Sequence, residues 1–242
     1  YEEYGQTKEL TLSISCPAAI DLLFAQETPI KFVCREDGTP VTGCNNLDPN
    51  CYLALHRARD AAISIAQNRT HSIPDRLSLL LLFAVRLQKL IDTEAYGRLD
   101  GLLARFSDNQ AVRRDLARAK RMQSKPSAFF PCWMLLNNME HLTRRFGVML
   151  DAAVGQDAPP APFRDAFSVQ YENLTVYFLF RYALKAVNDR QYLARVEQCV
   201  FHLLCLRELS ADAATVQELT EVVSLYSKEV EHSEDNQALL LK

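Results

Sequence analysis

Two cysteines and a histidine recur at intervals of three residues late in this chain, at Cys199, His202 and Cys205. Thiolate and imidazole groups at close spacing are ligands that zinc accepts in proteins. On a helix, however, these three side chains spread over an arc of about 120°, and zinc needs a fourth ligand that converges with them. Because the neighbouring residues from Val200 to Leu206 are otherwise apolar, we interpret the three as core residues rather than metal ligands.

Four further cysteines lie in the N-terminal part of the chain, at Cys16, Cys34, Cys44 and Cys51. Their spacing is irregular and contains no C-x-x-C pair, which a structural zinc site usually offers. Zinc ligation, disulfide bonding and ordinary free thiols are the alternatives, and we favour free thiols for all seven cysteines, counting Cys132. We therefore predict no bound metal, no disulfide and an intracellular location, cytoplasmic or nuclear.

Catalytic and cofactor-binding motifs are missing from the sequence. None of the five histidines falls in an H-E-x-x-H pattern, and there is no G-x-S-x-G, Walker A or dinucleotide-binding fingerprint. Seven glycines in 242 residues are few for loops that cradle phosphates. The sequence therefore predicts no catalytic residues and no cofactor, and we expect that the chain is not an enzyme.

Charge is distributed unevenly along the chain, although its net charge is only −3. Residues 101–150 contain nine basic and three acidic residues, a local charge of +6. Residues 208–235 contain one basic and eight acidic residues, a local charge of −7. Such asymmetry is typical of surfaces that attract partners of opposite charge.

The basic residues form a stripe on one predicted helix. Arg114, Arg118, Arg121 and Lys125 follow one another at i, i+4, i+7 and i+11, and Arg113 adjoins them. Like charges at this spacing repel by roughly 0.2–0.5 kcal/mol per pair. A solvated helix face, an acidic protein surface (including the chain's own acidic C-terminal segment) and nucleic acid are the alternatives, and the pI of about 6.0 argues against a dedicated nucleic-acid domain. We predict that these five residues bind a protein partner with an acidic surface.

Amphipathic periodicity predicts helices through most of the chain. Asp48 is a suitable N-cap and Pro49 a suitable first residue for a helix that ends near Gln67. Further helices are predicted at about 74–91, 94–106, 108–123, 132–150, 163–187, 190–209 and 212–231. The second of these eight helices is apolar nearly all round as far as Val85, so we expect Leu80, Leu81 and Phe83 to be almost fully buried.

Three local features refine the predicted helices. Ser107 and Gln110 are spaced as a capping box for the basic helix. Prolines and a glycine in residues 151–162 indicate a surface loop. Aromatic residues at helical spacing in residues 163–187 favour a core helix, with a partner groove or a ligand pocket as alternatives.

The N-terminal 46 residues have a different pattern. Residues from Glu9 to Ser15 alternate between apolar and polar types, which predicts a strand, and Ile30–Cys34 is a second candidate. A short helix from Pro17 to Gln26 is expected between them. We therefore predict an N-terminal β-containing extension at residues 1–46, packed on an all-helical domain at residues 47–242.

The sequence as a whole predicts a mainly α fold, an irregular bundle of about eight helices with a small N-terminal β element. The longest apolar runs, Leu79–Val85 and Phe129–Leu136, fall short of the roughly 18 residues that a membrane-spanning helix needs. Because the chain starts at Tyr1 and stops after an apolar triplet, we expect a domain excised from a larger protein. Without a catalytic motif, the favoured function is protein interaction or scaffolding, and the alternative is a nucleic-acid-associated or ligand-sensing regulatory domain.

Overall fold

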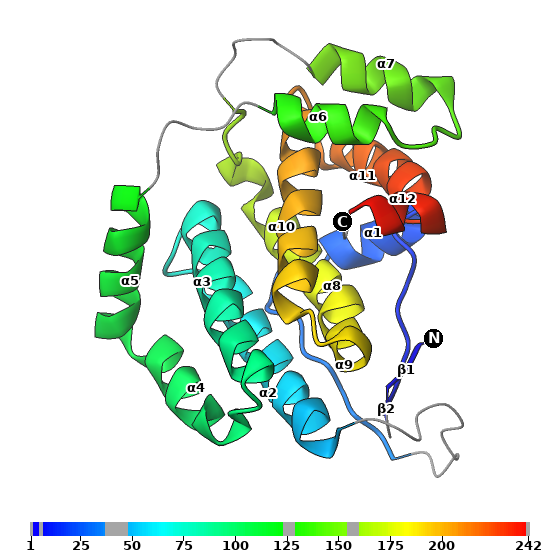
Figure 1. The fold of residues 1–242 in the computed structure, drawn as a ribbon. Coiled ribbons are helices and arrows are strands. Elements are labelled where there is room, and N and C mark those ends of the chain that lie inside the picture. Colours follow the sequence, from blue (N-terminus) through cyan, green and yellow to red (C-terminus); the bar gives the residue numbers. More distant parts are fainter. Residues whose placement is uncertain (1, 5–6, 37–47, 123–128, 154–159, 241–242) are drawn as a thin grey trace. The chain divides into compact units, whose positions relative to one another are not determined.

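A computed structural model describes residues 2–4, 7–36, 48–122, 129–153 and 160–240, which are mainly helical with one small sheet (Figure 1). The predicted mainly α fold is confirmed. The chain divides into two compact units, of which unit 1 comprises residues 1–11, 28–122 and 172–199, and unit 2 comprises residues 12–27, 123–171 and 200–242. The predicted division of the chain after residue 46 stays a prediction.

Unit 1 contains the N-terminal sheet and the first long helices. Its elements are β1 Glu2–Tyr4, β2 Thr7–Glu9, α2 Pro49–Ala66, α3 Ile73–Asp92, α4 Leu99–Ser107, α5 Asn109–Met122 and α9 Ala186–Asp189, with the 3₁₀ turns η1 Tyr96–Arg98 and η3 Ala183–Lys185. Unit 2 contains α1 Pro17–Phe24, α6 Phe130–Asn137, α7 Arg144–Ala153, η2 Asp165–Phe167, α11 Val216–Val230 and α12 Glu234–Leu239. The division between the units falls inside α8 Ser168–Tyr182 and α10 Tyr192–Leu209.

Side-chain caps fix where several helices begin. Asp48 accepts a hydrogen bond from the backbone N–H of Asn50 at 2.9 Å, as its sequence position predicted. Ser72 caps α3 in the same way at 3.3 Å. Thr215 and Glu218 form a reciprocal capping box at the start of α11. These caps satisfy backbone N–H groups that have no partner within the helix.

The predicted cap of the basic helix is placed one residue too early. Asp108 accepts the hydrogen bond from the backbone N–H of Gln110 at 2.8 Å, so it caps α5. The hydroxyl of Ser107 instead donates to the carbonyl oxygen of Leu103 at 3.1 Å, within α4. Ser107 therefore ends one helix, and the carboxylate of Asp108, which also suits the positive end of the helix dipole, begins the next.

Helix α3 lies against α2, α4 and α5, and it supplies much of the core of unit 1. Leu80 and Phe83 are 1% and 0% exposed, as predicted, and the ring of Phe83 packs edge-on against Phe106 at 5.1 Å between centroids. The prediction for Leu81 is wrong, because it is only half-buried, and Val85 is 39% exposed. Three helix neighbours leave one side of α3 open to solvent, which apolar residues alone did not reveal.

The N-terminal sheet is an antiparallel hairpin that pairs Glu2 with Glu9 and Tyr4 with Thr7. The predicted strand from Glu9 to Ser15 is wrong beyond its first residue, because Leu10 and Leu12 are 79% and 57% exposed. The alternating pattern has no neighbouring strand to pair with there.

The predicted strand at residues 30–34 is also wrong, because that segment forms neither strand nor helix. It is held by tertiary contacts within unit 1. The ring of Phe32 stacks on Phe180 at 4.1 Å, and the side-chain amide of Gln67 donates to the carbonyl oxygen of Ile30 at 3.0 Å.

The predicted helix at 132–150 is two helices, α6 and α7, which contact each other within unit 2. The connecting backbone is held by α11 and α12. Glu229 accepts hydrogen bonds from the N–H of Leu142 at 2.6 Å and the hydroxyl of Thr143 at 2.5 Å. Asn236 accepts from the N–H of Glu140 at 3.0 Å. These partners satisfy the backbone where a continuous helix would otherwise have used its own carbonyl groups.

The predicted aromatic helix at 163–187 is broken into η2, α8, η3 and α9. Its aromatic residues are core residues, since Phe167, Tyr171, Phe178 and Tyr182 are at most 3% exposed. Helix α12 was not predicted. Of the predicted loop at 151–162, residues 154–159 lie outside the described part of the chain.

Candidate functional site

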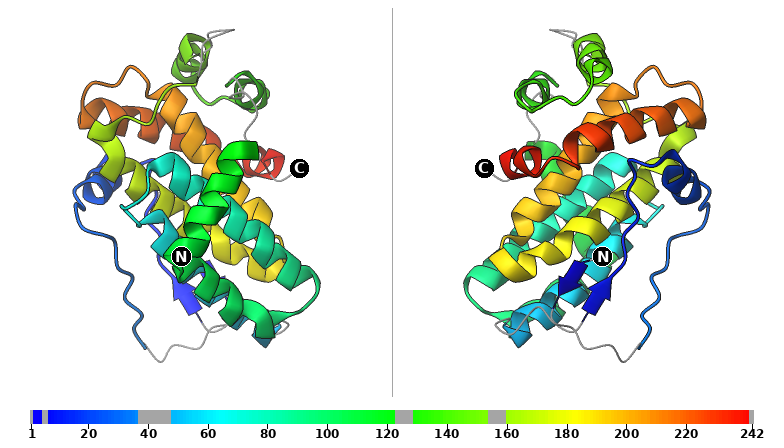
Figure 2. Two further views of the ribbon diagram at one scale, coloured as in Figure 1. Left: turned by 90° about the vertical axis from the view of Figure 1, so that its left-hand side faces the viewer. Right: turned by 90° about the vertical axis from the view of Figure 1, so that its right-hand side faces the viewer.

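Helix α5 carries the predicted binding residues, and its buried side determines which side chains face solvent. Ala111, Val112 and Leu116 are between 3% and 7% exposed, and α5 contacts α3 and α4 (Figure 1, Figure 2). Their spacing of one, four and five residues places them on one face of the helix. The apolar contacts of α5 are therefore all made on the side opposite its basic residues.

A buried carboxylate fastens this face. Asp115 is 6% exposed and accepts hydrogen bonds from Arg86 of α3 at 2.6 and 3.0 Å, and from Arg105 of α4 at 2.8 and 3.1 Å. The two guanidinium groups hold the pKa of Asp115 well below its usual range, with Arg86 the larger cause. Arg86 also lies over the ring of Phe106 at 5.4 Å. One carboxylate therefore joins three helices.

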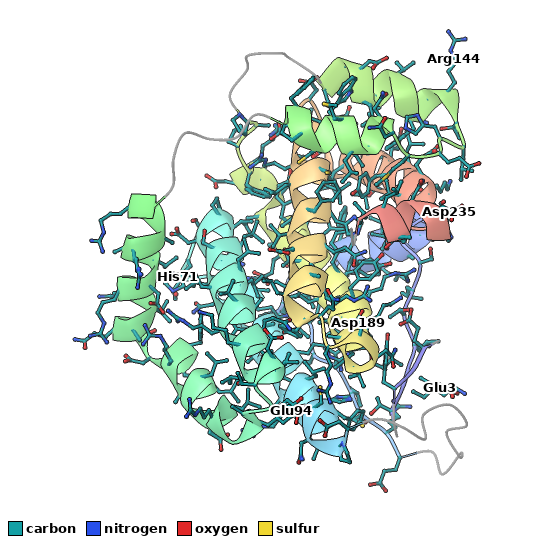
Figure 3. The ribbon with its side chains drawn as sticks, viewed as in Figure 1. Glu3, His71, Glu94, Arg144, Asp189 and Asp235 are labelled. Carbon is teal, nitrogen blue, oxygen red and sulfur yellow. The ribbon has the colours of Figure 1, made fainter. Side chains whose placement is uncertain are left out.

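The basic side chains of α5 lie on the opposite side. Arg113, Arg114, Arg118 and Arg121 are all exposed, and within the described residues none of them forms an ion pair. Figure 3 shows nitrogen-bearing side chains extending from α5 away from α3. Lys125, the fifth predicted residue, lies outside the described part of the chain. We call the four arginines the α5 basic ridge.

A neighbouring lysine does not belong to the ridge. Lys120 forms an ion pair with Asp75 of α3 at 2.8 Å, which neutralises it at the edge of the buried face. The charge of the ridge is therefore carried by guanidinium groups alone. Arginine is suited to binding carboxylates, because its planar fork can donate two parallel hydrogen bonds.

The sequence analysis missed Asp115, Arg86 and Arg105, which orient the ridge. A signal was present, because Asp115 is the one acidic residue between Asn109 and Met122 and its neighbours at i−3 and i+1 are the apolar Val112 and Leu116. A carboxylate on an apolar helix face has to be paired when it is buried. The partner residues could not be found this way, since several arginines were available.

The acidic C-terminal segment is less exposed than its composition indicates. Glu208, Glu229 and Glu231 are 9%, 0% and 7% exposed, and Glu208 accepts hydrogen bonds from the N–H of Ala161. Glu218 is used in the capping box of α11. Half of the eight acidic residues thus have structural roles inside unit 2, and the segment is not a uniformly acidic surface.

The predicted core role of Cys199, His202 and Cys205 agrees with their burial, since each is at most 2% exposed. His202 Nδ1 lies 2.8 Å from the hydroxyl oxygen of Tyr226, and their rings pack edge-on. In the described residues, no three His, Cys, Asp or Glu side chains lie close enough together to hold a metal ion. The six described cysteines are free thiols, and Cys44 lies outside that part.

None of the helices in the described part of the chain is both long enough and apolar enough to cross a membrane. The fold and the ridge thus define a helical domain with an outward-facing, positively charged surface. That description fits several classes of protein, so the class has to come from comparison with known families.

A family model for the C-terminal domain of the FliB lysine N-methylase matches residues 59–242. Because this match covers more than half of the chain, the chain belongs to the family of FliB lysine N-methylase C-terminal domains. Comparisons with curated proteins and with solved structures gave no match.

The family corrects the function predicted from sequence. The prediction of a scaffolding domain is wrong, because the matched family is part of a methylase. The prediction that the chain is not an enzyme is narrowed, since the family relates it to an enzyme by way of a C-terminal domain. The sequence gave no sign of this, because helices without a recognisable motif carry no trace of the chemistry that they serve.

Proposed function

We propose that this chain acts in lysine N-methylation, and that its α5 basic ridge binds an acidic surface of the protein whose lysine is methylated. The family match supports the reaction class. The exposure of four arginines, with their helix fastened on the other side by Asp115, supports the docking role. In this proposal the partner of the ridge is a substrate of the enzyme, and cytoplasmic location stays a prediction alongside it.

The ridge would act mainly on the encounter with the substrate. Charge complementarity between protein surfaces raises the association rate more than it slows dissociation. An acidic surface beside the target lysine would be drawn to the ridge, and bidentate contacts from arginine would fix its orientation. Methyl transfer itself would use groups of the methylase that we do not assign here to described residues.

The test is methylation of lysine by the methylase that contains this chain, with extract of the source cells as substrate and an isotope-labelled methyl donor. Arg114→Glu, Arg118→Glu and Arg121→Glu together should lower the initial rate at limiting substrate by about tenfold or more. The rate at saturating substrate should change much less. Methyl-lysine is counted by mass spectrometry.

A matched control changes net charge equally elsewhere. Arg35, Arg98 and Arg144 are exposed arginines outside α5 that form no ion pair in the described residues. Their combined change to Glu should leave the rate at limiting substrate close to that of the parent. If both triple variants lose activity equally, net charge is responsible and the ridge is not a docking site.

Nucleic acid is the competing partner for the ridge, and the same variants address it. Binding of labelled duplex DNA is measured over a range of salt concentrations, since neutralised phosphates give a steep dependence on salt. If the ridge variant loses DNA binding while its methylation rate is unchanged, the ridge binds nucleic acid and the proposed docking role is wrong.

A further inference from the structure

Two cysteines from distant parts of the sequence meet inside unit 2. Cys132 lies in α6 and Cys205 in the part of α10 that belongs to unit 2, and their side chains hydrogen-bond to each other. Cys205 is 0% exposed, whereas Cys132 is half-buried. The pair therefore consists of one thiol that reagents can reach and one that they cannot.

The surroundings make the two thiols chemically unequal. The hydrogen bond from Cys205 lowers the pKa of Cys132, and the positive charge of Arg207 adds to this while partial burial opposes it. Burial raises the pKa of Cys205 well above its usual value. Thiolates rather than thiols attack disulfides, so Cys132 is the nucleophile of the pair.

We propose that Cys132 and Cys205 are a reversible redox pair, which exchanges with low-molecular-weight disulfides and closes a disulfide bond between α6 and α10. This inference goes beyond the proposed docking function and does not depend on it. It also qualifies the sequence-based prediction of seven inert thiols, because these two become a disulfide when such an oxidant is present.

The exchange needs two steps. The Cys132 thiolate attacks one sulfur of glutathione disulfide, whose S–S bond breaks, and one glutathione leaves as a thiolate that takes up a proton. Cys205 then loses its proton and attacks the Cys132 sulfur of the mixed disulfide, which expels the second glutathione. The two cysteines are oxidised by two electrons in total, and glutathione disulfide is reduced to two molecules of glutathione.

The chain provides an internal reporter for this reaction. Trp133, the single tryptophan of the sequence, directly follows Cys132. A disulfide beside an indole ring quenches its fluorescence. Closure of the bond should therefore lower tryptophan emission, and reduction with dithiothreitol should restore it.

The experiment treats the intact chain with glutathione disulfide, blocks the remaining thiols with iodoacetamide and maps disulfides by mass spectrometry after trypsin digestion. We expect a link between the peptides that carry Cys132 and Cys205, together with reversible loss of Trp133 emission. Both changes should disappear in Cys132→Ser. That variant alters a half-buried side chain, so it should fold even if Cys205→Ser does not.

A control is needed because Arg195 and Arg207 enclose both Cys199 and Cys205 in one tryptic peptide. Cys199→Ser removes this ambiguity, and it should still form the link and still lose emission. Cys16 and Cys34, which are exposed, report non-specific oxidation.

Three results would overturn the proposal. One is a link that persists in Cys132→Ser or disappears in Cys199→Ser. Another is Cys132 recovered only as a mixed disulfide with glutathione. The last is full alkylation of Cys132 after oxidation, at the level of a sample that never met the oxidant.

Discussion

Asp115 of α5 accepts two hydrogen bonds from the guanidinium of Arg86 in α3, at 2.6 and 3.0 Å. This contact determines the rotation of α5 about its own axis, because Asp115 lies on the same face as Val112 and Leu116. The basic ridge is consequently held on the outer side. A buried acid that is not part of the ridge is thus the residue that presents the ridge to solvent.

Asp115→Asn should lower the free energy of unfolding by about 1–3 kcal/mol. The amide keeps the shape of the side chain but leaves Arg86 and Arg105 without their counter-charge. The value lies below the 3–5 kcal/mol typical of a broken buried ion pair, because both arginines are partly exposed to solvent. Urea denaturation measures the change, and Asp108→Asn is the control, since Asn also caps helices well. Equal effects of the two variants would contradict the anchoring role.

The same contact predicts a dependence of stability on pH. The pKa of Asp115 is lowered in the folded chain by Arg86 and Arg105, so the carboxylate stabilises the fold above the unfolded-state pKa of about 3.9. This stabilisation is lost as pH falls below about 4 toward the lower folded-state pKa. The difference in unfolding free energy between the parent and Asp115→Asn should therefore be largest near pH 7 and shrink at about pH 3. A difference that stays constant over this range would show that Asp115 is not held as a carboxylate.

Salt should reveal the ridge in the methylation reaction. Exposed charges are screened over about 8 Å at physiological ionic strength. Raising the salt concentration should therefore lower the parent's rate at limiting substrate, and lower it much less when Arg114, Arg118 and Arg121 are changed to Glu. A parallel dependence in both proteins would mean that other charged groups steer the substrate.

Local signals predicted the parts of the fold that neighbours in sequence determine. Asp48 and Pro49 located the start of α2, and helical periodicity located α3 and α10. The break between α6 and α7 could not be predicted, because the residue that holds it, Glu229, is 87 positions from Leu142. The same holds for the site, where periodicity identified the exposed arginines of α5 but not the residues of α3 and α4 that orient them.

The core of unit 1 offers a direct comparison within one helix. Phe83→Ala should lower the free energy of unfolding by about 3–5 kcal/mol, because its fully buried ring packs against Phe106 and Tyr192. Val85→Ala, on the exposed side of α3, should cost less than about 1 kcal/mol. Urea denaturation of both variants tests this, and similar losses would mean that α3 is covered on all sides in solution.

Two arginines that share one carboxylate should differ in importance. Glu172 is 1% exposed and accepts hydrogen bonds from Arg76 at 2.8 Å and from Arg69 at 3.0 Å. Arg76 is itself buried and also donates to the carbonyl oxygens of Ala66 and His71, at 2.9 and 2.8 Å, which closes the turn between α2 and α3.

Arg76→Met should therefore cost about 3–5 kcal/mol of unfolding free energy, because it removes the buried half of the pair and leaves two carbonyl groups without a donor. Arg69→Met should cost only about 1 kcal/mol, since the Arg69 side chain is 42% exposed and Glu172 keeps its contact with Arg76. Chemical denaturation of the two variants at neutral pH measures both values. If Arg69→Met proves as damaging as Arg76→Met, the outer arginine carries the pair and the buried one mainly fills space.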